Sequence, residues 1–193
     1  GFGRYDQPRG TWSDDSSLTL CTMESLVRGY DLEDLGATFS RWLFDSHWTP
    51  TGYVLDVGLT TYVALDNIRN DKKSARDSGC DGEDDNGNGS LMRMLPAALF
   101  FRKKQTDSFL ERIHEISAVT HRHPRALMGC GIYSLFVREL LKSEDKTAAF
   151  RAAMETADHY YGPLDHFKPE CENYKRLLSC SLLSCTEDKI YSS

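Results

Sequence analysis

The sequence has no long apolar run, no export signal and no surplus of basic residues. Its longest apolar run, Leu95 to Phe101, is far too short to cross a bilayer, and the first segment, GFGRYDQPRG, has no basic stretch followed by an apolar one. We therefore expect no membrane partner and a cytoplasmic protein. The net charge of −6 argues against nonspecific nucleic-acid binding, which needs excess lysine and arginine.

The cysteines also lack a pattern. There are 6 of them, with no C-x-x-C pair and no regular spacing. They are Cys21, Cys80, Cys130, Cys171, Cys180 and Cys185. This scatter is typical of reduced thiols in a cytosolic protein and argues against structural zinc.

Apolar residues recur with helical spacing through most of the 193 residues. The segment 31–44 places Leu35, Phe39 and Trp42 on one side, and no alternating strand pair or fixed repeat is found. Further helices are expected in SSLTLCTMESLVRG, LTTYVALDNI, SLMRMLPAALFF, TDSFLERIHEISAV, PRALMGCGIYSLFVRELL, SEDKTAAFRAAMETADHYY and ECENYKRLLSCSLL. The sequence predicts one all-α domain over residues 1–193.

Capping residues and prolines mark the ends of these helices. Asp31, Thr106 and Ser143 occupy positions typical of N-caps, and Pro124 falls where a first helical residue is expected. Pro96 should bend or stagger the helix that contains it.

Residues 84–89, DDNGNG, match the opening of a calcium-binding EF-hand loop. That loop needs a glutamate at its twelfth position, where this chain has Leu95, so calcium binding of that type is excluded. What remains is a glycine-rich turn before a helix, which forms either a simple turn or a cradle for an anion. A Walker lysine is absent, and no third glycine of a dinucleotide-binding motif follows Gly87 and Gly89.

Three other polar groups precede predicted helices. Ser13, Asp14 and Asp15 either cap a helix or bind a hard divalent cation with their oxygens. In THRHP, the two histidines bind metal or serve as neutral hydrogen-bonding groups. The segment 56–61, DVGLTT, is interpreted as a cap with a glycine before its helix.

Taken in order, SDDS, DVGLTT, NGNGSLMR and THRHP resemble the ADP-ribosylglycohydrolase family over about residues 10–193. The stretches NGNGSLMRMLP and THRHP are the most specific part of the resemblance. It implies an all-α orthogonal helical bundle with a site for two Mg²⁺ or Mn²⁺ ions at one end.

The resemblance also implies roles for individual residues. Ser13, Asp14 and Asp15 match the family's T-D-D metal ligands, with serine in place of threonine. Asp85 would act close to the reacting bond, so that Asp85 and Asp15 form the expected catalytic set. The ligand's phosphates and ribose would be held by Gly87, Asn88, Gly89, Ser90 and His121. Arg93 would face phosphate or pair with an acid inside the bundle.

Two family elements are missing. The D-x-D-T element that closes the metal site does not follow THRHP, where the only later acid cluster is Thr186-Glu187-Asp188, and no G-D-x-x-G motif precedes GFGRYDQ. We interpret the chain as a domain incomplete at both ends, from an active enzyme, with the other side of the metal site supplied by a missing segment. A degenerate member that has lost half of its metal site is the alternative.

The resemblance implies a hydrolase that cleaves an N- or O-glycosidic bond to ADP-ribose. Its expected partner is an ADP-ribosylated protein, such as one modified on arginine, or a small molecule that contains ADP-ribose. Oxocarbenium character in the transition state calls for a carboxylate and a positioned water. The rival hypothesis is an interaction or immunity module that binds ADP-ribose or a toxin without turnover. A helical bundle with no ligand is the third.

Overall fold

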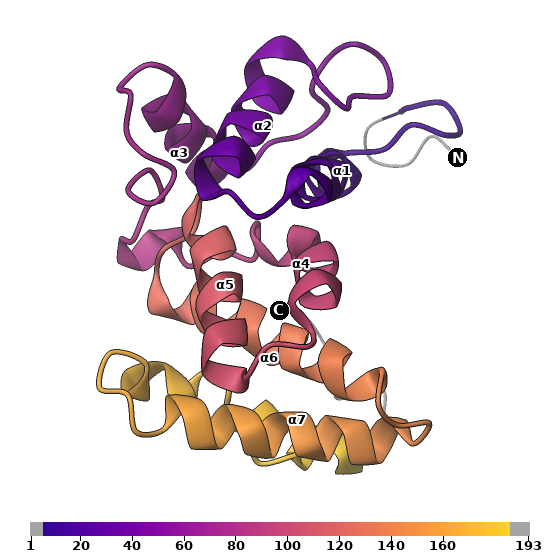
Figure 1. The fold of residues 1–193 in the computed structure, drawn as a ribbon, viewed down its shortest axis with the longest axis vertical. Helices are drawn as coiled ribbons and strands as arrows, with labels where there is room; N and C mark the ends of the chain where they lie inside the picture. Colours follow the sequence, from indigo (N-terminus) through magenta and orange to yellow (C-terminus); the bar gives the residue numbers. More distant parts are fainter. Residues whose placement is uncertain (1–5, 186–193) are drawn as a thin grey trace.

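The protein is a stack of helices that cross at steep angles, seen in a computed structural model that describes residues 6–185 (Figure 1). The first three helices, at the top of Figure 1, are α1 (Asp14–Arg28), α2 (Leu32–Asp45) and α3 (Leu59–Arg69). The middle of the stack holds α4 (Met94–Phe101), α5 (Thr106–Ala118) and α6 (Pro124–Leu140). Below them runs α7 (Lys146–Tyr161), with the short α8 (Lys175–Leu178) behind it.

Short 3₁₀ turns complete the described chain: η1 (Glu83–Asp85), η2 (Leu91–Arg93), η3 (Lys168–Glu172) and η4 (Ser181–Ser184). Within residues 6–185 the strand-like pairing is limited to one isolated bridge, between Cys80 and His121. The predicted all-α fold is therefore confirmed. The acid cluster Thr186-Glu187-Asp188 lies outside the described residues.

The core lies between α5, α6 and α7 and continues upward to α2. Fully buried side chains include Phe39 and Trp42 of α2 and Phe109 and Ile113 of α5. A Cβ at Gly131 of α6 would lie 1.7 Å from the hydroxyl oxygen of Tyr161, so α6 and α7 approach this closely only because residue 131 is glycine.

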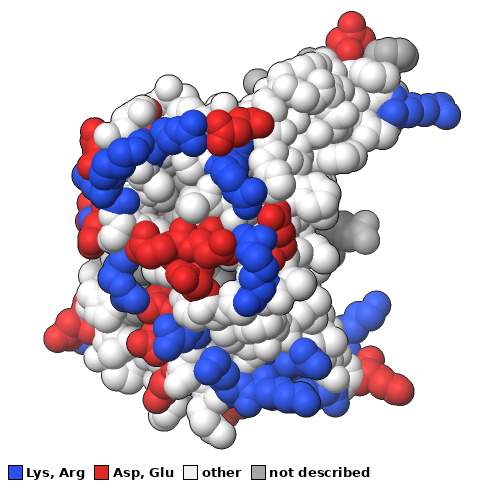
Figure 2. All heavy atoms as spheres, turned by 45° about the horizontal axis from the view of Figure 1, so that its top comes forward, with Lys and Arg blue, Asp and Glu red and all other residues white. Residues whose placement is uncertain are grey.

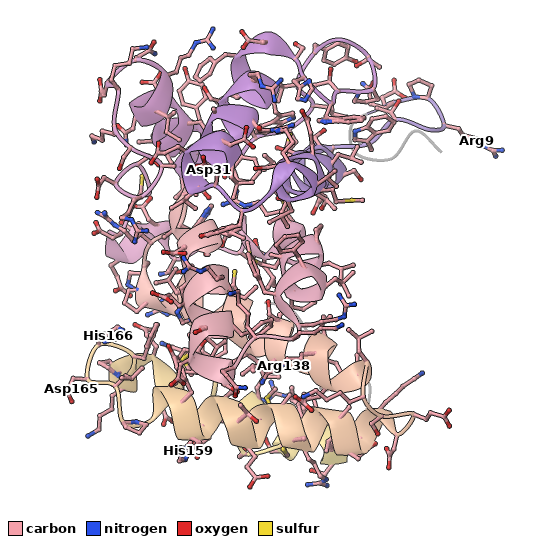
Figure 3. The ribbon with its side chains drawn as sticks, viewed as in Figure 1. Arg9, Asp31, Arg138, His159, Asp165 and His166 are labelled. Carbon is pink, nitrogen blue, oxygen red and sulfur yellow. The ribbon has the colours of Figure 1, made fainter. Side chains whose placement is uncertain are left out.

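Two predicted helix starts are confirmed. The carboxylate of Asp31 accepts hydrogen bonds from the backbone N–H groups of Glu33 and Asp34, at 2.9 and 3.3 Å, which makes Asp31 the N-cap of α2 (Figure 3). Pro124 is the first residue of α6, where no intrahelical N–H bond is lost.

Two other predicted caps are wrong. Thr106 is the first residue of α5 and not its cap, and its hydroxyl accepts a 3.2 Å bond from Arg138 of α6 (Figure 3). At α7 the cap is Asp145, two residues after Ser143, because its carboxylate accepts from free N–H groups of the first turn. The hydroxyl of Ser143 instead accepts from the backbone N–H of Asp145 at 3.1 Å.

Two predicted helices are interrupted. SLMRMLPAALFF forms η2 followed by α4, and Pro96 sits in the first turn of α4, where its missing N–H has no intrahelical partner to lose. ECENYKRLLSCSLL forms η3, α8 and η4 in place of one helix. Cys180, with φ of 56°, has a left-handed backbone that ends the helical run.

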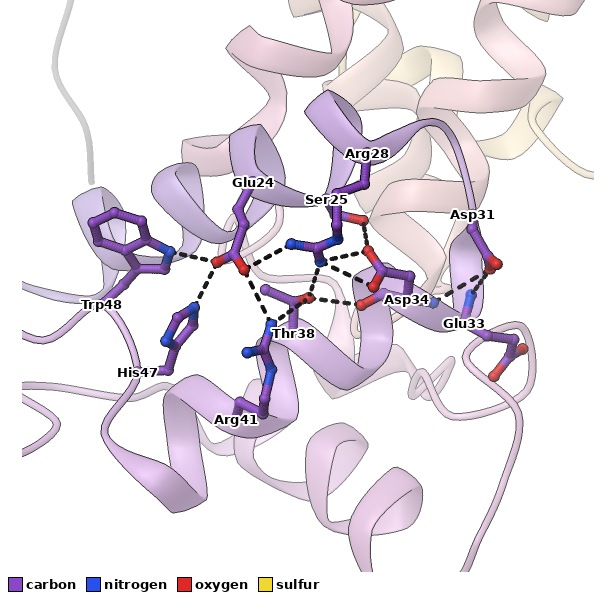
Figure 4. Close-up of polar contacts among 10 residues, drawn as sticks. All are labelled: Glu24, Ser25, Arg28, Asp31, Glu33, Asp34, Thr38, Arg41, His47 and Trp48. Atoms are coloured by element: carbon purple, nitrogen blue, oxygen red, sulfur yellow. Dashed lines mark hydrogen bonds and ion pairs between the residues drawn. The ribbon is translucent and has the colours of Figure 1, made fainter.

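A charged network on Glu24 joins α1, α2 and the segment after α2 (Figure 4). Its carboxylate accepts hydrogen bonds from Arg28 at 2.7 Å and Arg41 at 3.2 Å, and from Trp48 at 2.6 Å, while His47 Nε2 lies 2.5 Å away. Burial opposes ionisation of Glu24, but these bonds outweigh it and lower the pKa of Glu24 to about 2. The network anchors the start of the segment that leads to Asp56 and α3.

The surface is mixed in character. On the face in Figure 2, acidic and basic side chains are intermixed. Surface ion pairs include Arg69–Asp45, at 3.0 Å. Apolar side chains are exposed along α1 and α4, where Val27, Leu95 and Phe100 help to line a shallow cavity of about 530 Å³. No helix in the described part of the chain is long and apolar enough to span a bilayer.

We expect Glu24→Gln to lower the free energy of unfolding by about 1–3 kcal/mol at pH 7, the range for hydrogen bonds to a charged group. Because the folded pKa of Glu24 is about 2 and its ordinary value is 4.5, its stabilisation is present above pH 4.5 and is lost as pH falls toward 2. The variant should therefore lose less stability than the wild type across that window. Urea unfolding at several pH values measures both effects.

The control is Glu155→Gln, which changes an exposed carboxylate on α7. It should leave both the stability at pH 7 and its acid dependence close to those of the wild type. Equal behaviour of the two variants would show that the bonds to Glu24 add nothing to stability.

Candidate functional site

The acid pair predicted from SDDS lies at the first turn of α1. Ser13 occupies the N-cap position but its side chain makes no capping hydrogen bond, and its hydroxyl donates to Asp15 Oδ2 at 2.9 Å. Asp14 and Asp15 begin the helix, where negative charge suits the helix dipole. The Ser13 hydroxyl thus bonds to a carboxylate of the same group and not to the helix backbone.

Asp14 is crowded by other carboxylates. Burial raises the pKa of Asp14, and the negative charges of Asp15 and Asp56 raise it further, while the Ser13 hydroxyl and the Asp15 backbone oppose the shift. The strongest influences on Asp14 within the described residues therefore include no cation. An added positive charge at this position would stabilise the ionised form.

The start of α3 lies between this acid group and the glycine loop, residues 87–90. Asp56, whose charge reaches Asp14, stands three residues before Leu59, the first residue of α3, and has φ of 65°. At the second residue of the helix, the Thr60 hydroxyl donates to Asp85 Oδ1 at 3.0 Å. The first turn of α3 thus connects the acid pair of α1 to the acidic end of the glycine loop.

Gly89 brings the glycine loop against His121. A Cβ at Gly89 would lie 2.8 Å from His121 Cε1 and 3.5 Å from the hydroxyl oxygen of Thr61. At Gly87 the nearest atom would be His121 Nε2, at 4.0 Å. Asn88 is exposed, and its carbonyl accepts from the Leu91 N–H at 2.9 Å. The structure thus brings together the loop and the histidine proposed to share a ligand.

The last loop residue, Ser90, points into the core. It is 1% exposed, and its hydroxyl accepts from Ser117 at 2.7 Å and lies 3.3 Å from Cys130 Sγ. Any contact from Ser90 to a ligand would therefore come from its backbone. Arg93 also points inward, where its partners are Thr120 and the carbonyls of Ile116 and Ser117, so neither phosphate nor an acid pairs with it in this structure.

The two histidines of THRHP serve different purposes. His123 is the N-cap of α6, because its Nδ1 accepts from the Arg125 backbone N–H at 3.1 Å. Its Nε2 lies 3.3 Å from Glu83, whereas His121 faces Gly89. The pair does not converge on one point, so the metal-binding interpretation of THRHP is not supported.

Residues 6–185 contain no group of three or more His, Cys, Asp or Glu side chains arranged to hold a metal ion. Ser13, Asp14 and Asp15 nevertheless fit a divalent cation in chemistry, because their oxygens are hard ligands and Asp14 is crowded by like charge.

Sequence reasoning missed three residues at the start of α3. Asp56, Thr60 and Thr61 lie in DVGLTT, which we interpreted as a structural cap, yet they stand between the two halves of the site. The available signal was a second acid and two hydroxyl residues placed, like SDDS, at a helix start. Their proximity to Asp14 and Gly89 depends on the fold and not on spacing.

This bundle, with acids and a glycine loop at its helix starts, belongs to the ADP-ribosylglycohydrolase family, whose sequence profile matches residues 1–189. A solved structure described as an ADP-ribosylglycohydrolase-related protein complex has the same fold, with a TM-score of 0.68 and 25% identity, over 92% of this chain and 53% of that one. The predicted family is therefore confirmed.

Two curated relatives of this chain are named as ADP-ribosylarginine hydrolases. The chain is 26% identical to ADP-ribosylarginine hydrolase Tri1 of Serratia proteamaculans over 78% of this chain and 41% of that protein. It is 27% identical to ADP-ribosylarginine hydrolase Tri1 of Pseudomonas putida over 81% of this chain and 42% of the relative. The chain thus spans less than half the length of these curated relatives.

We expect Gly89→Ala to lower the free energy of unfolding by about 1–3 kcal/mol, the usual effect of overpacking. The added methyl group would overlap the His121 ring, which is 3% exposed and held by Thr120, so neither side can move freely. Thermal or urea unfolding measures the loss.

Gly87→Ala is the matched control, because a Cβ there would have its nearest neighbour at 4.0 Å. A loss equal to that of Gly89→Ala would show that the close contact with His121 is not the cause.

Proposed function

We propose that the protein containing this chain hydrolyses the glycosidic bond between ADP-ribose and a modified acceptor, such as an arginine side chain of an ADP-ribosylated protein. The family and the two ADP-ribosylarginine hydrolases similar to this chain support the reaction. The observation that carries the proposal is the start of α3: Asp56 acts on Asp14 through its charge, Thr60 donates to Asp85, and Thr61 lies beside Gly89.

The glycine loop and His121 form the binding half of this proposal. Gly89 packs directly against the ring of His121, Gly87 leaves more space beside the same ring, and Asn88 is exposed. Glycines allow a ligand to approach backbone N–H groups, which suit phosphate oxygens. This end would therefore hold the diphosphate and ribose of ADP-ribose, and the acceptor would lie toward the carboxylates.

Asp85 stands closest to the reacting sugar in this proposal. Its carboxylate is oriented by the Thr60 hydroxyl and lies near His121, whose pKa its charge influences. A carboxylate next to the anomeric carbon stabilises oxocarbenium character, or takes the proton of an attacking water. Asp15 supports the same centre from the first turn of α1.

Ser13, Asp14 and Asp15 would hold one side of a site for two Mg²⁺ or Mn²⁺ ions. When bound, such ions would supply positive charge that orients ribose hydroxyls and polarises water. Without such ions, the negative charge of Asp14 is repelled by those of Asp15 and Asp56, and the groups that shift its pKa most include no cation.

We expect saturating Mg²⁺ or Mn²⁺ to raise the Tm of the full-length protein, and Asp14→Asn to abolish most of that rise, because a bound ion stabilises the state that holds it. In the absence of ions, Asp14→Asn should itself raise Tm at neutral pH. The raised pKa of Asp14 means that its contribution to stability falls as pH increases through that pKa, so the ionised group is destabilising at pH 7.

The control for charge alone is Asp165→Asn, at an exposed position far from α1 (Figure 3). It should keep the ion-dependent rise in Tm. An equal rise in the wild type and in Asp14→Asn would place the ions elsewhere.

We expect the full-length protein to release ADP-ribose from an ADP-ribosylated arginine protein in the presence of Mg²⁺ or Mn²⁺. Asp85→Asn should lower kcat by about 10²–10⁴-fold with little change in affinity, as for loss of an acid–base group. Asn88→Ala should instead weaken ADP-ribose binding by about tenfold, as for loss of one hydrogen bond. Release assays and calorimetric titration separate the two effects.

Binding of ADP-ribose without release by the full-length protein would contradict the hydrolase and indicate a binding module. Absence of both binding and release would exclude either function. Equal losses of kcat and affinity in the two variants would remove the division of roles between Asp85 and Asn88.

A further inference from the structure

Arg93 is a buried cation whose side chain is only partly satisfied. Its side chain is 0% exposed, its guanidinium carbon lies 4.4 Å from the centre of the Phe39 ring, and its Nε and Nη1 have no hydrogen-bond partner among the described residues. Burial lowers the pKa of Arg93 to about 10, so the group stays protonated at neutral pH and can only donate hydrogen bonds. Unpaired buried donors destabilise a fold, and the arrangement therefore calls for an explanation.

The one side-chain hydroxyl that accepts from Arg93 belongs to Thr120. Arg93 Nη2 donates to Thr120 Oγ1 at 2.7 Å, and the same hydroxyl lies 2.7 Å from His121 Nδ1. Thr120 is 0% exposed, so water does not compete for its hydroxyl. A hydroxyl has one proton to give, and after accepting from the guanidinium it can give that proton to His121 Nδ1.

This direction of donation decides where His121 carries its own proton. If Nδ1 accepts, the ring proton of the neutral histidine must be on Nε2. Nε2 is on the side of the ring that faces the glycine loop, 3.0 Å from where a Cβ of Gly89 would lie, and it has no hydrogen-bond partner among the described side chains and backbone. The ring therefore presents a donor to whatever occupies the loop.

The backbone around the ring holds it in this orientation. The His121 N–H donates to the Ser117 carbonyl at 2.9 Å, and the Cys80 N–H donates to the Thr120 carbonyl at 3.1 Å. The charged groups that act on the ring are Arg93 and Asp85. Burial and the charge of Arg93 lower the pKa of His121 to about 4, against the opposing effect of Asp85.

We propose that Arg93 and Thr120 are positioning residues that fix His121 in the Nε2–H tautomer, so that the ring donates one neutral hydrogen bond to an oxygen of the ligand in the glycine loop. The identity of that ligand as ADP-ribose rests on the proposed function. The tautomer itself does not, because it is set before any ligand binds. An oxygen acceptor, such as a phosphate or ribose oxygen, suits this donor.

The test is the nitrogen-15 spectrum of the histidine side chains in the ligand-free, full-length protein near pH 7, which distinguishes protonated from unprotonated ring nitrogens. His121→Gln assigns the His121 signals. His123 is an internal reference, because its Nδ1 accepts from the Arg125 N–H and its proton also belongs on Nε2. We expect His121 in the wild type to be a single Nε2–H tautomer.

Two variants of Thr120 test whether its hydroxyl sets the His121 tautomer. Thr120→Val removes the hydroxyl but keeps the shape of the side chain, and it should give a mixture of His121 tautomers and about tenfold weaker ADP-ribose binding. Thr120→Ser retains the hydroxyl and should keep both the tautomer and the affinity. In Thr120→Val the signals of His123 should not move.

A proton on Nδ1 of His121 in the wild type overturns the proposal, even if Thr120→Val fails to fold. A single Nε2–H tautomer in Thr120→Val overturns the role of the hydroxyl. If the tautomers behave as expected but ADP-ribose does not bind to the wild type, the positioning role of Arg93 and Thr120 is retained and the proposed function fails.

Discussion

The contacts of the buried Arg93 guanidinium hold together the end of the fold that carries the glycine loop and His121. Arg93 is the last residue of η2, and its guanidinium stacks on Phe39 of α2 and donates to Thr120 just after α5. A buried charge is costly to separate from its partners, so these contacts fix the positions of the three elements relative to one another. Gly89 precedes Arg93 and His121 follows Thr120, and the contact between Gly89 and His121 follows from this arrangement.

Helix starts supply the chemistry around this fixed point. α1 begins with Asp14, α3 is preceded by Asp56, and His123 caps α6. Free N–H groups at helix starts favour negative charge, so acidic residues there are compatible with helix formation. The segment before α3 is anchored at its beginning by the bonds from His47 and Trp48 to Glu24 (Figure 4), which links the stability of the α1–α2 pair to the placement of Asp56.

The sequence predicted the helices better than it predicted their ends. Apolar periodicity located α1 to α7 because each helix buries one face. The cap of α7 was misplaced because Ser143, two residues before the true cap Asp145, is also a typical capping residue and bonds a backbone N–H. Motif resemblance predicted Asp14, Asp85 and the glycine loop as site residues, and this assignment stays a prediction. The resemblance could not show that the Ser90 hydroxyl turns into the core, because that depends on Ser117 and Cys130, which are distant in sequence.

Two charged groups at the same end of the molecule are imperfectly paired, one negative and one positive. Asp14 is crowded by Asp15 and Asp56, whereas two nitrogens of Arg93 lack partners within the described residues. A fold selected for stability alone would replace both groups, since apolar substitutes for imperfectly paired buried charges are often neutral or stabilising. Such imperfectly paired groups concentrate where function requires them. An added cation would stabilise the crowded carboxylate of Asp14, whereas burial and the charge of Arg93 together keep His121 neutral.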